Sequence, residues 1–288
     1  MKRSTFAEGE KFTFTATQSK QIPDTEGLWI FYFDGDGILQ VTQTFSADLI
    51  KMYALVAILY WDATNGVAVR FADERHGIRM DGDTHEYLHT IERMRYVAPG
   101  LGLTSVVSDG NGDDDEDAQC GYEAGELRDE DIVLDIPAQI APAQFDALYL
   151  DGTNWRKRAS QSFLAIADAG RALHNPISGG SGSLVEVSNN DFLLCHIFGD
   201  NDTSGELLYF VGQEEYSTRA LARAGALVEI NNIYTVGLPM AEYKPLFTVI
   251  LQTSSGYANA VKTRVVQTEE GRDYVDSGRL IPPVSPGS

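Results

Sequence analysis

The chain has few cysteines and little positive charge, and both shortages narrow the kinds of protein that it can be. Its 288 residues include only Cys120 and Cys195, so we expect free thiols, one of them buried, rather than a disulfide framework. Lysine and arginine number 22 against 42 aspartates and glutamates, which gives a formal net charge of −20 at pH 7. Such a surface repels phosphate and argues against nucleic acid or an anionic membrane as a partner.

Long hydrophobic runs are also missing. The longest covers residues 52–61 and is closed by Lys51 and Asp62, which is too short to cross a bilayer and is typical of a buried strand. The first residues are basic, but no apolar stretch follows them. We therefore expect no signal peptide and a chain that is made in the cytoplasm.

The sequence does contain a succession of strand patterns with tight turns. Residues 27–33 and 38–44 alternate as strands around an Asp-Gly-Asp-Gly turn, and an Asn-Gly pair separates the strands expected at 55–61 and 67–71. Asp-Gly and Asn-Gly supply the positive φ angles that a tight hairpin turn requires. Two hairpins at the start of the chain suggest a sandwich or a barrel-like sheet.

The pattern as a whole predicts a mainly β protein, with two β-sandwich-like halves and two short helices. Pro137 and Pro142 mark the expected boundary between the halves. The sequence thus predicts an N-terminal β-rich domain at residues 1–140 and a C-terminal β-rich domain at 141–288.

The two expected helices carry different signals. The first begins at Asp83 as its N-cap, with Glu86 three residues later at the spacing of a capping box. The second covers residues 217–230, where apolar residues recur at helical spacing and predict one face directed at the core. That face comprises Leu221, Ala224, Leu227 and Val228.

Negative charge is concentrated in residues 109–135, which hold twelve carboxylates and a single arginine. The loop at 109–117 cannot pack against itself, so we expect it to be solvated. The alternative is a loosely bound cation, because the loop begins with the alternating oxygen ligands of an EF-hand. Asp114 stands where that motif requires a glycine, which favours the solvated loop.

The most specific chemical motif runs from His85 to His89. On a helix these two histidines lie on one face and could hold one zinc ion, with Glu86 activating a bound water, as in the zincin peptidases. The context differs, because the expected helix begins only at Asp83 and no recognisable third-ligand motif follows. A structural role for both histidines is the favoured interpretation, and a zinc-dependent hydrolase is the alternative.

Other catalytic signatures are absent from the sequence. It has no Walker loop and no dinucleotide fingerprint, and the glycine-rich run at 179–183 misses the nucleophile elbow. No catalytic, cofactor-binding or metal-binding residue is therefore assigned, and the chain is interpreted as a non-enzyme. Aromatic residues are numerous enough for sugar stacking, which keeps a glycan-binding module as a further alternative, although Trp29 and Trp61 are expected in the core.

Two segments suggest contacts with neighbours in an assembly. Residues 156–158 (Arg-Lys-Arg) form the strongest basic cluster outside the termini, and we expect it to pair with an acidic surface of another subunit. The proline-rich end at 280–288 is expected to be extended and to dock on a neighbour.

Five blocks of the sequence resemble a family of tail-associated proteins from tailed bacteriophages. They are residues 61–65 (WDATN), 72–89 (ADERHGIRMDGDTHEYLH), 128–132 (RDEDI), 154–157 (NWRK) and 272–276 (RDYVD). Members of the family continue the last block with Trp-Arg, where this chain has Ser277 and Gly278.

The resemblance implies a non-enzymatic virion protein of the tail apparatus, such as a tail fibre, a fibre adaptor or a tail-tip component. It implies assembly in the host cytoplasm, with other tail proteins and further copies of the chain as partners, and no catalytic residues to carry over. Attachment to a host-surface glycan through many weak contacts is a further expectation.

Overall fold

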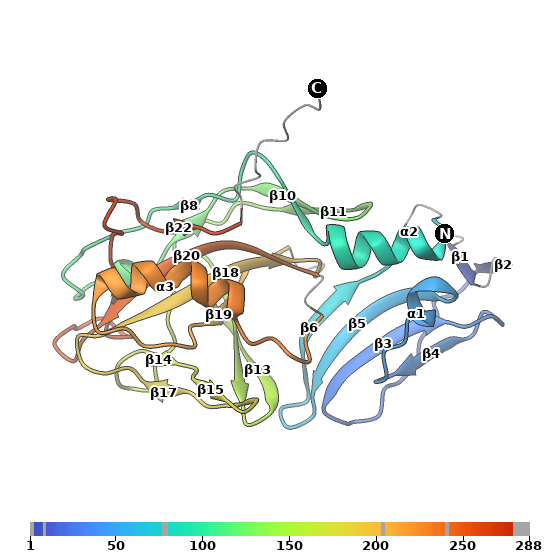
Figure 1. Cartoon of the computed structure of the whole chain (residues 1–288), viewed down its shortest axis with the longest axis horizontal. Helices are drawn as coiled ribbons and strands as arrows, with labels where there is room; N and C mark the ends of the chain where they lie inside the picture. The colour runs from blue at the N-terminus through green and yellow to red at the C-terminus, as the bar shows by residue number, and fades with distance from the viewer. Residues whose placement is uncertain (1–2, 8–9, 77–79, 203–204, 240–241, 279–288) are drawn as a thin grey trace.

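A computed structural model of the chain describes residues 3–7, 10–76, 80–202, 205–239 and 242–278 (Figure 1). Strands make up most of the regular structure, which confirms the expected mainly β fold. Among the described residues, no helix combines the length and the apolar character needed to span a membrane. The proline-rich end expected at 280–288 lies outside them.

The N-terminal part forms a four-stranded antiparallel sheet in the order β4-β3-β5-β6. Its strands are β3 (Gly27–Phe33), β4 (Leu39–Thr42), β5 (Ala54–Asp62) and β6 (Val67–Asp73), with the short helix α1 (Asp48–Lys51) before β5 and the hairpin β1 (Arg3–Ala7) and β2 (Glu10–Phe14) before β3. Both predicted hairpins are confirmed. Gly37 and Gly66 in their turns have φ angles of 72° and 66°, as the turn chemistry requires.

A larger sheet at the centre of the molecule has the order β13-β12-β19-β18-β20-β21, with β22 also paired to β20. Its strands are β12 (Phe145–Asp151), β13 (Asn154–Gln161), β18 (Phe192–Asp200), β19 (Leu208–Val211), β20 (Tyr243–Thr253), β21 (Thr263–Val265) and β22 (Val275–Asp276). Every residue of β18 is buried, which identifies it as the centre of the fold.

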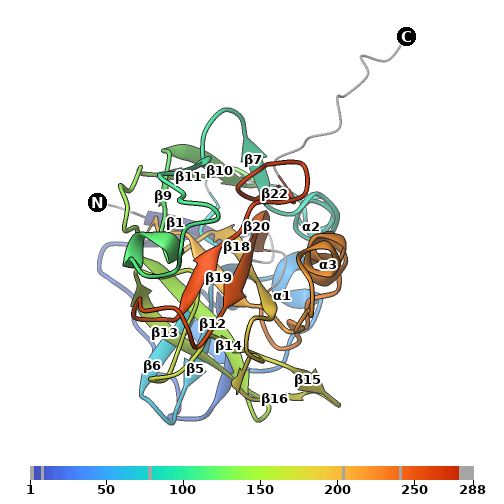
Figure 2. The same ribbon diagram turned by 90° about the vertical axis from the view of Figure 1, so that its left-hand side faces the viewer.

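A three-stranded sheet, in the order β11-β10-β7, lies over the central sheet (Figures 1 and 2). Its strands are β7 (Arg95–Val97), β10 (Gly125–Asp129) and β11 (Ile132–Ile136). Short pairs complete the strands: β8 (Leu103–Thr104) with β9 (Gly121–Tyr122), β14 (Leu173–His174) with β17 (Val185–Glu186), and β15 (Ile177–Ser178) with β16 (Ser181–Gly182).

One hydrophobic cluster extends across the expected domain boundary at 140–141. It contains Tyr122 and Leu134 from one side of the boundary and Phe145 and Leu193 from the other, all buried. Cys120 and Cys195 belong to the same cluster and are both free thiols. The core is therefore continuous between the two expected halves.

Helix α2 (Gly82–Tyr87) continues into a π-helical turn, η1 (Leu88–Glu92). The predicted cap is wrong. The N-cap is Asp81, whose side chain accepts a hydrogen bond from the backbone N–H of Thr84 at 3.0 Å. Asp83 and Glu86 instead form salt bridges with Lys51 of helix α1, at 3.2 and 2.8 Å. Two acidic residues on the exposed side of α2 thus hold α1 against it.

Helix α3 (Arg219–Asn232) forms near the predicted place, but the predicted buried face is wrong. The four residues expected in the core are all exposed: Leu221, Ala224, Leu227 and Val228. The buried residues are Ala222, Ala226, Glu229 and Ile230. Alanine lets a helix backbone approach a sheet closely, so Ala222 and Ala226 pack against the sheet, and Ile230 completes the buried face.

The basic cluster at 156–158 is neutralised within the chain. The pairs are Arg156 with Glu26 at 2.6 Å, Lys157 with Asp146 at 3.0 Å, and Arg158 with Asp168 at 2.7 Å. The charge that suggested an acidic neighbouring subunit therefore has partners in the same chain.

The acidic loop at 109–117 is mostly exposed, as expected, and ends in the 3-10 helix η2 (Asp115–Ala118). Asp117 is the exception, because its buried carboxylate accepts a hydrogen bond from the N–H of Gly112 at 2.7 Å. A neighbouring carboxylate, that of Asp115, accepts one from the N–H of Ala260 at 3.0 Å. Hydrogen bonds to the backbone thus anchor this loop.

Candidate metal centre

Six side chains that can bind metals converge where four parts of the fold meet. They form two groups: an outer triad of His76, His85 and Glu130, and an inner triad of Glu74, His89 and Glu242. In each triad the candidate ligand atoms lie within 4.8 Å of one another. We refer to the six residues together as the His–Glu cluster.

The ligands come from four separate segments. Glu74 and His76 follow strand β6, while His85 and His89 lie on the continuous helix formed by α2 and η1. Glu130 occupies the turn between β10 and β11, and Glu242 immediately precedes β20. In Figure 1 helix α2 lies over the β5–β6 end of the N-terminal sheet, beside the β10–β11 hairpin. The cluster therefore joins the N-terminal sheet, the helix, the hairpin and the central sheet.

The helix brings its two histidines together through their spacing. Residues four apart lie on the same face of a helix, and the imidazole rings of His85 and His89 have centroids 5.8 Å apart. The ring of His76 lies 5.1 Å from that of His85 in an edge-on arrangement. Three imidazoles thus line one side of the cluster.

Hydrogen bonds orient two of these rings. The Nδ1 atom of His85 lies 3.2 Å from the carbonyl oxygen of Ile50, and because a carbonyl only accepts, Nδ1 carries the proton. The Nε2 atom of His85 then presents a lone pair to the cluster. In His76, Nδ1 lies 2.8 Å from the carboxylate of Asp131. Metal-binding histidines typically hold their second nitrogen in this way.

Glu130 lies between all three histidines. One of its oxygens, Oε2, lies 3.4 Å from Nδ1 of His76 and 3.9 Å from Nε2 of His85. The other, Oε1, lies 3.7 Å from Nδ1 of His89. The backbone of Glu130 has a φ of 52°, in a hairpin turn where glycine is favoured. A glutamate in that conformation is strained, as are eight other non-glycine residues with a positive φ among the described residues.

The inner triad is the more buried of the two. Glu74 and Glu242 are each 1 % exposed, and His89 is 7 % exposed. Oε2 of Glu74 lies 3.9 Å from Nδ1 of His89, and Oε1 of Glu242 lies 3.1 Å from Nε2 of the same ring. The side-chain amide of Asn201 holds the second oxygen of Glu242, to which it donates a hydrogen bond at 2.7 Å.

Eight polar atoms of the His–Glu cluster are buried without a hydrogen-bond partner. They are both carboxylate oxygens of Glu74 and of Glu130, Oε1 of Glu242, Nε2 of His76 and of His85, and Nδ1 of His89. Burying one such atom unpaired costs about 1–3 kcal/mol, and more when the group is charged. A cation among these atoms would satisfy carboxylate oxygens and imidazole lone pairs together.

The protonation equilibria of the cluster are strongly perturbed. Burial raises the pKa of Glu74 and raises that of Glu242 well above its usual range. Burial also lowers the pKa of His85, which favours its neutral form. In His76 burial acts in the same direction, but Glu74, Glu130 and Asp131 outweigh it and raise the pKa to about 9. A metal ion would displace the protons that these groups otherwise hold.

The arrangement differs from that of a zincin. In that family the glutamate between the two histidines lies beside the metal, whereas Glu86 points to the surface and pairs with Lys51. The sequence motif nevertheless selected two of the six clustered residues. Of the other four, Glu74, His76 and Glu130 fall within the blocks at 72–89 and 128–132 that carry the phage-tail resemblance, while no sequence signal marked Glu242.

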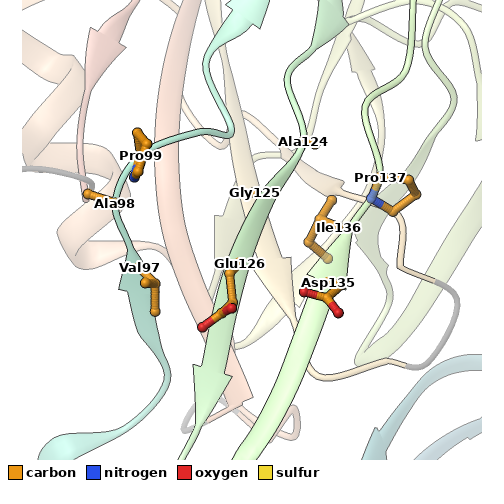
Figure 3. A pocket seen from close by; sticks show the side chains of 9 residues that line it. All are labelled: Val97, Ala98, Pro99, Ala124, Gly125, Glu126, Asp135, Ile136 and Pro137. Carbon is orange, nitrogen blue, oxygen red and sulfur yellow. The ribbon is translucent and has the colours of Figure 1, made fainter.

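A surface hollow of about 510 Å³ lies away from this cluster, over the three-stranded sheet (Figure 3). Its walls come from strand β7 with the residues after it and from β10 and β11, and Glu126 and Asp135 point into it side by side (Figure 3). Glu126 is already paired with Arg128 at 2.6 Å. The hollow is therefore a weaker candidate for a functional site than the His–Glu cluster.

Comparison with protein-family models, curated protein sequences and solved structures finds no match for this chain.

Proposed function

We propose that this chain is a metalloprotein that binds divalent transition-metal ions in the His–Glu cluster. The observation that carries the proposal is the burial of three histidines and three glutamates at one place, where eight polar atoms lack a hydrogen bond and have only one another as partners, at 3.1–3.9 Å. A carboxylate buried without a partner is costly, and in folded proteins such groups are paired with charges or coordinate metals.

The donor set favours a transition metal over calcium or magnesium. Imidazole nitrogen and carboxylate oxygen together suit zinc, manganese or iron, whereas calcium and magnesium prefer oxygen ligands alone. Neither cysteine takes part, because Cys120 and Cys195 lie in the apolar core. We therefore expect zinc, manganese or iron(II) at this site.

The ion would act on the stability of the fold. Its ligands lie at the end of β6, on α2 and η1, in the β10–β11 turn and before β20, so coordination would fasten four elements at one point. Because the ligands come together only in the folded chain, the free energy of binding adds to the free energy of unfolding.

We propose that this metalloprotein acts in the tail apparatus of a bacteriophage. What supports it is the sequence resemblance, together with one spatial observation: the resembling blocks at 72–89 and 128–132 supply five of the six cluster residues. In this proposal the chain is a non-enzymatic virion protein that acts with other tail proteins and with further copies of itself. Labelling of purified phage particles with antibody to the chain tests this setting.

Metal analysis of the purified chain tests the metalloprotein proposal directly. We expect bound zinc, manganese or iron in elemental analysis, and a lower melting temperature after dialysis against a chelator that is then removed. Glu242→Gln and His89→Ala should lose metal. Glu86→Gln is the matched control, because Glu86 lies on the same helix but faces Lys51. Chelated protein that takes up no transition metal on reconstitution would refute the proposal.

A further inference from the structure

We infer that the His–Glu cluster is a two-ion centre, in which the outer and inner triads each hold one metal ion and the Glu130 carboxylate bridges them. The inference rests on the proposed metalloprotein function and extends it to the number and arrangement of the ions.

The spacing of the ligands supports two ions. Donor atoms on opposite sides of one transition-metal ion, at about 2.0–2.2 Å each, lie no more than about 4.5 Å apart. The candidate ligand atoms of each triad lie within 4.8 Å of one another, slightly more than this span, and each triad mixes histidine with glutamate. The two triads adjoin, because Nε2 of His76 lies 3.8 Å from Oε2 of Glu74. Three protein ligands are sufficient for a zinc-type site that keeps a position for solvent.

Glu130 is placed to bridge the triads. Its Oε2 lies 3.9 Å from Nε2 of His85 in the outer triad and 3.4 Å from Nδ1 of His76, the nitrogen that Asp131 holds, while its Oε1 lies 3.7 Å from Nδ1 of His89 in the inner triad. The two oxygens of one carboxylate therefore face ligands of different triads. In two-metal sites the ions lie about 3.5–4 Å apart, which a bridging carboxylate can span.

The charge of the cluster also favours two ions. Three glutamates belong to the triads, and two further carboxylates touch them: Asp131 contacts His76, and Asp129 shares the amide of Asn201 with Glu242. Metal binding requires ionised carboxylate ligands, and with all five carboxyls ionised the buried region carries five negative charges, which is strongly unfavourable without cations. In that state one divalent ion leaves three of these charges uncompensated, whereas two ions leave one.

The two positions are not equivalent. The residues of the inner triad are buried, whereas those of the outer triad are partly exposed, although the ligand atoms are buried in both. We therefore expect a chelator to remove the outer ion first.

Reconstitution of the chelated full-length chain with Mn²⁺ tests the inference. We expect two ions per chain by elemental analysis and native mass spectrometry, and an electron paramagnetic resonance spectrum of a coupled pair. His85→Ala should retain one ion, with the spectrum of an isolated Mn²⁺. Glu86→Gln, checked with the others for a native circular dichroism spectrum, should retain two coupled ions.

The outcomes separate the inference from the proposal beneath it. A wild-type chain that binds one Mn²⁺ at saturation would overturn the two-ion centre and leave the metalloprotein proposal standing. A chain that binds none would remove both. Two ions without magnetic coupling would overturn the bridge formed by Glu130.

Discussion

The side-chain amide of Asn201 donates a hydrogen bond to Oε2 of Glu242 at 2.7 Å, which leaves Oε1 of that glutamate facing His89. The same amide nitrogen also donates to Asp129 at 2.8 Å. Asn201 thus fixes the inner triad without belonging to it. Partners of this kind, one step removed from the metal, set the orientation and the basicity of the ligands.

Asn201→Ala should therefore weaken metal binding although it removes no ligand. We expect the affinity for Zn²⁺ to fall by about 10–100-fold, the usual effect of losing such a partner. Competition with a chromophoric chelator measures the change. Asn231→Ala, on the exposed side of helix α3, is the control and should leave the affinity unaltered. Equal affinities for the two variants would contradict the role of Asn201.

Glu130→Gly should have opposite effects on stability and on metal content. Glycine accepts a φ of 52° without strain, and the substitution also removes a buried carboxylate that lacks hydrogen-bond partners. The metal-free variant should gain about 1 kcal/mol in free energy of unfolding. Chemical denaturation with and without Zn²⁺ measures both effects. The free energy of unfolding of the metal-free variant should exceed that of metal-free wild type, and Zn²⁺ should raise it by less than in wild type. A metal-free variant less stable than wild type would contradict this account.

Arg156→Ala should destabilise the chain strongly. Its buried guanidinium pairs with Glu26 at 2.6 Å and with the buried Asp62 at 3.1 Å, so the substitution leaves the Asp62 carboxylate in the interior without a charged partner, with only its hydrogen bonds from Asn65. Breaking a buried pair in this way costs about 3–5 kcal/mol. Arg158→Ala, whose partner Asp168 is exposed, should cost less than about 1 kcal/mol. Urea denaturation compares the two, and equal losses would argue against the internal role of Arg156.

The dependence of stability on pH should include a contribution from Glu229. Burial raises the pKa of this carboxyl, but hydrogen bonds from His196, Tyr216 and the backbone of Gln213 outweigh that effect and lower it below 4.5. A lowered pKa stabilises the folded state at neutral pH, and this contribution is lost as the pH falls from about 4.5 through the folded pKa. The difference in unfolding free energy between wild type and Glu229→Gln should be constant above about pH 5.5 and shrink below pH 4.5. A difference that stays constant into acid would exclude this contribution.

Helix α3 offers a matched pair of substitutions. Ala226 is fully buried against the sheet, so Ala226→Leu should overpack the interface and cost about 1–3 kcal/mol. Leu221 is 54 % exposed, and Leu221→Ala should change stability by less than about 0.5 kcal/mol. Thermal denaturation of both variants shows which face of the helix packs. A larger loss of stability for Leu221→Ala would instead support the buried face that the sequence predicted.

The features that the sequence predicted correctly depend on residues close together along the chain. Asp-Gly and Asn-Gly specify their turns by local backbone chemistry, so the hairpins β3–β4 and β5–β6 could be placed. The buried face of α3 could not be predicted in this way. The close approach of the sheet selects Ala222 and Ala226, and the pairing with His196 draws Glu229 inward. Periodicity records where apolar residues recur but contains no information on the width of the gap that they must fill.

Prediction of the His–Glu cluster from the sequence meets the same limit. The spacing of His85 and His89 on a helix is local, and the sequence pointed to both residues. Their partners lie on other segments, and Glu242 is separated from His89 by much of the chain. The Asp-Glu-Asp turn that contains Glu130 is part of the strongly acidic segment at 109–135, so composition gave no reason to single out this carboxylate.

The distribution of the ligands along the chain also determines when the centre can form. Glu242 is the last ligand to be synthesised, and the inner triad does not exist until that residue has left the ribosome. Nascent chains that expose Glu74 and His89 present an incomplete site. An ion in the inner triad would therefore be acquired only after most of the polypeptide has been made.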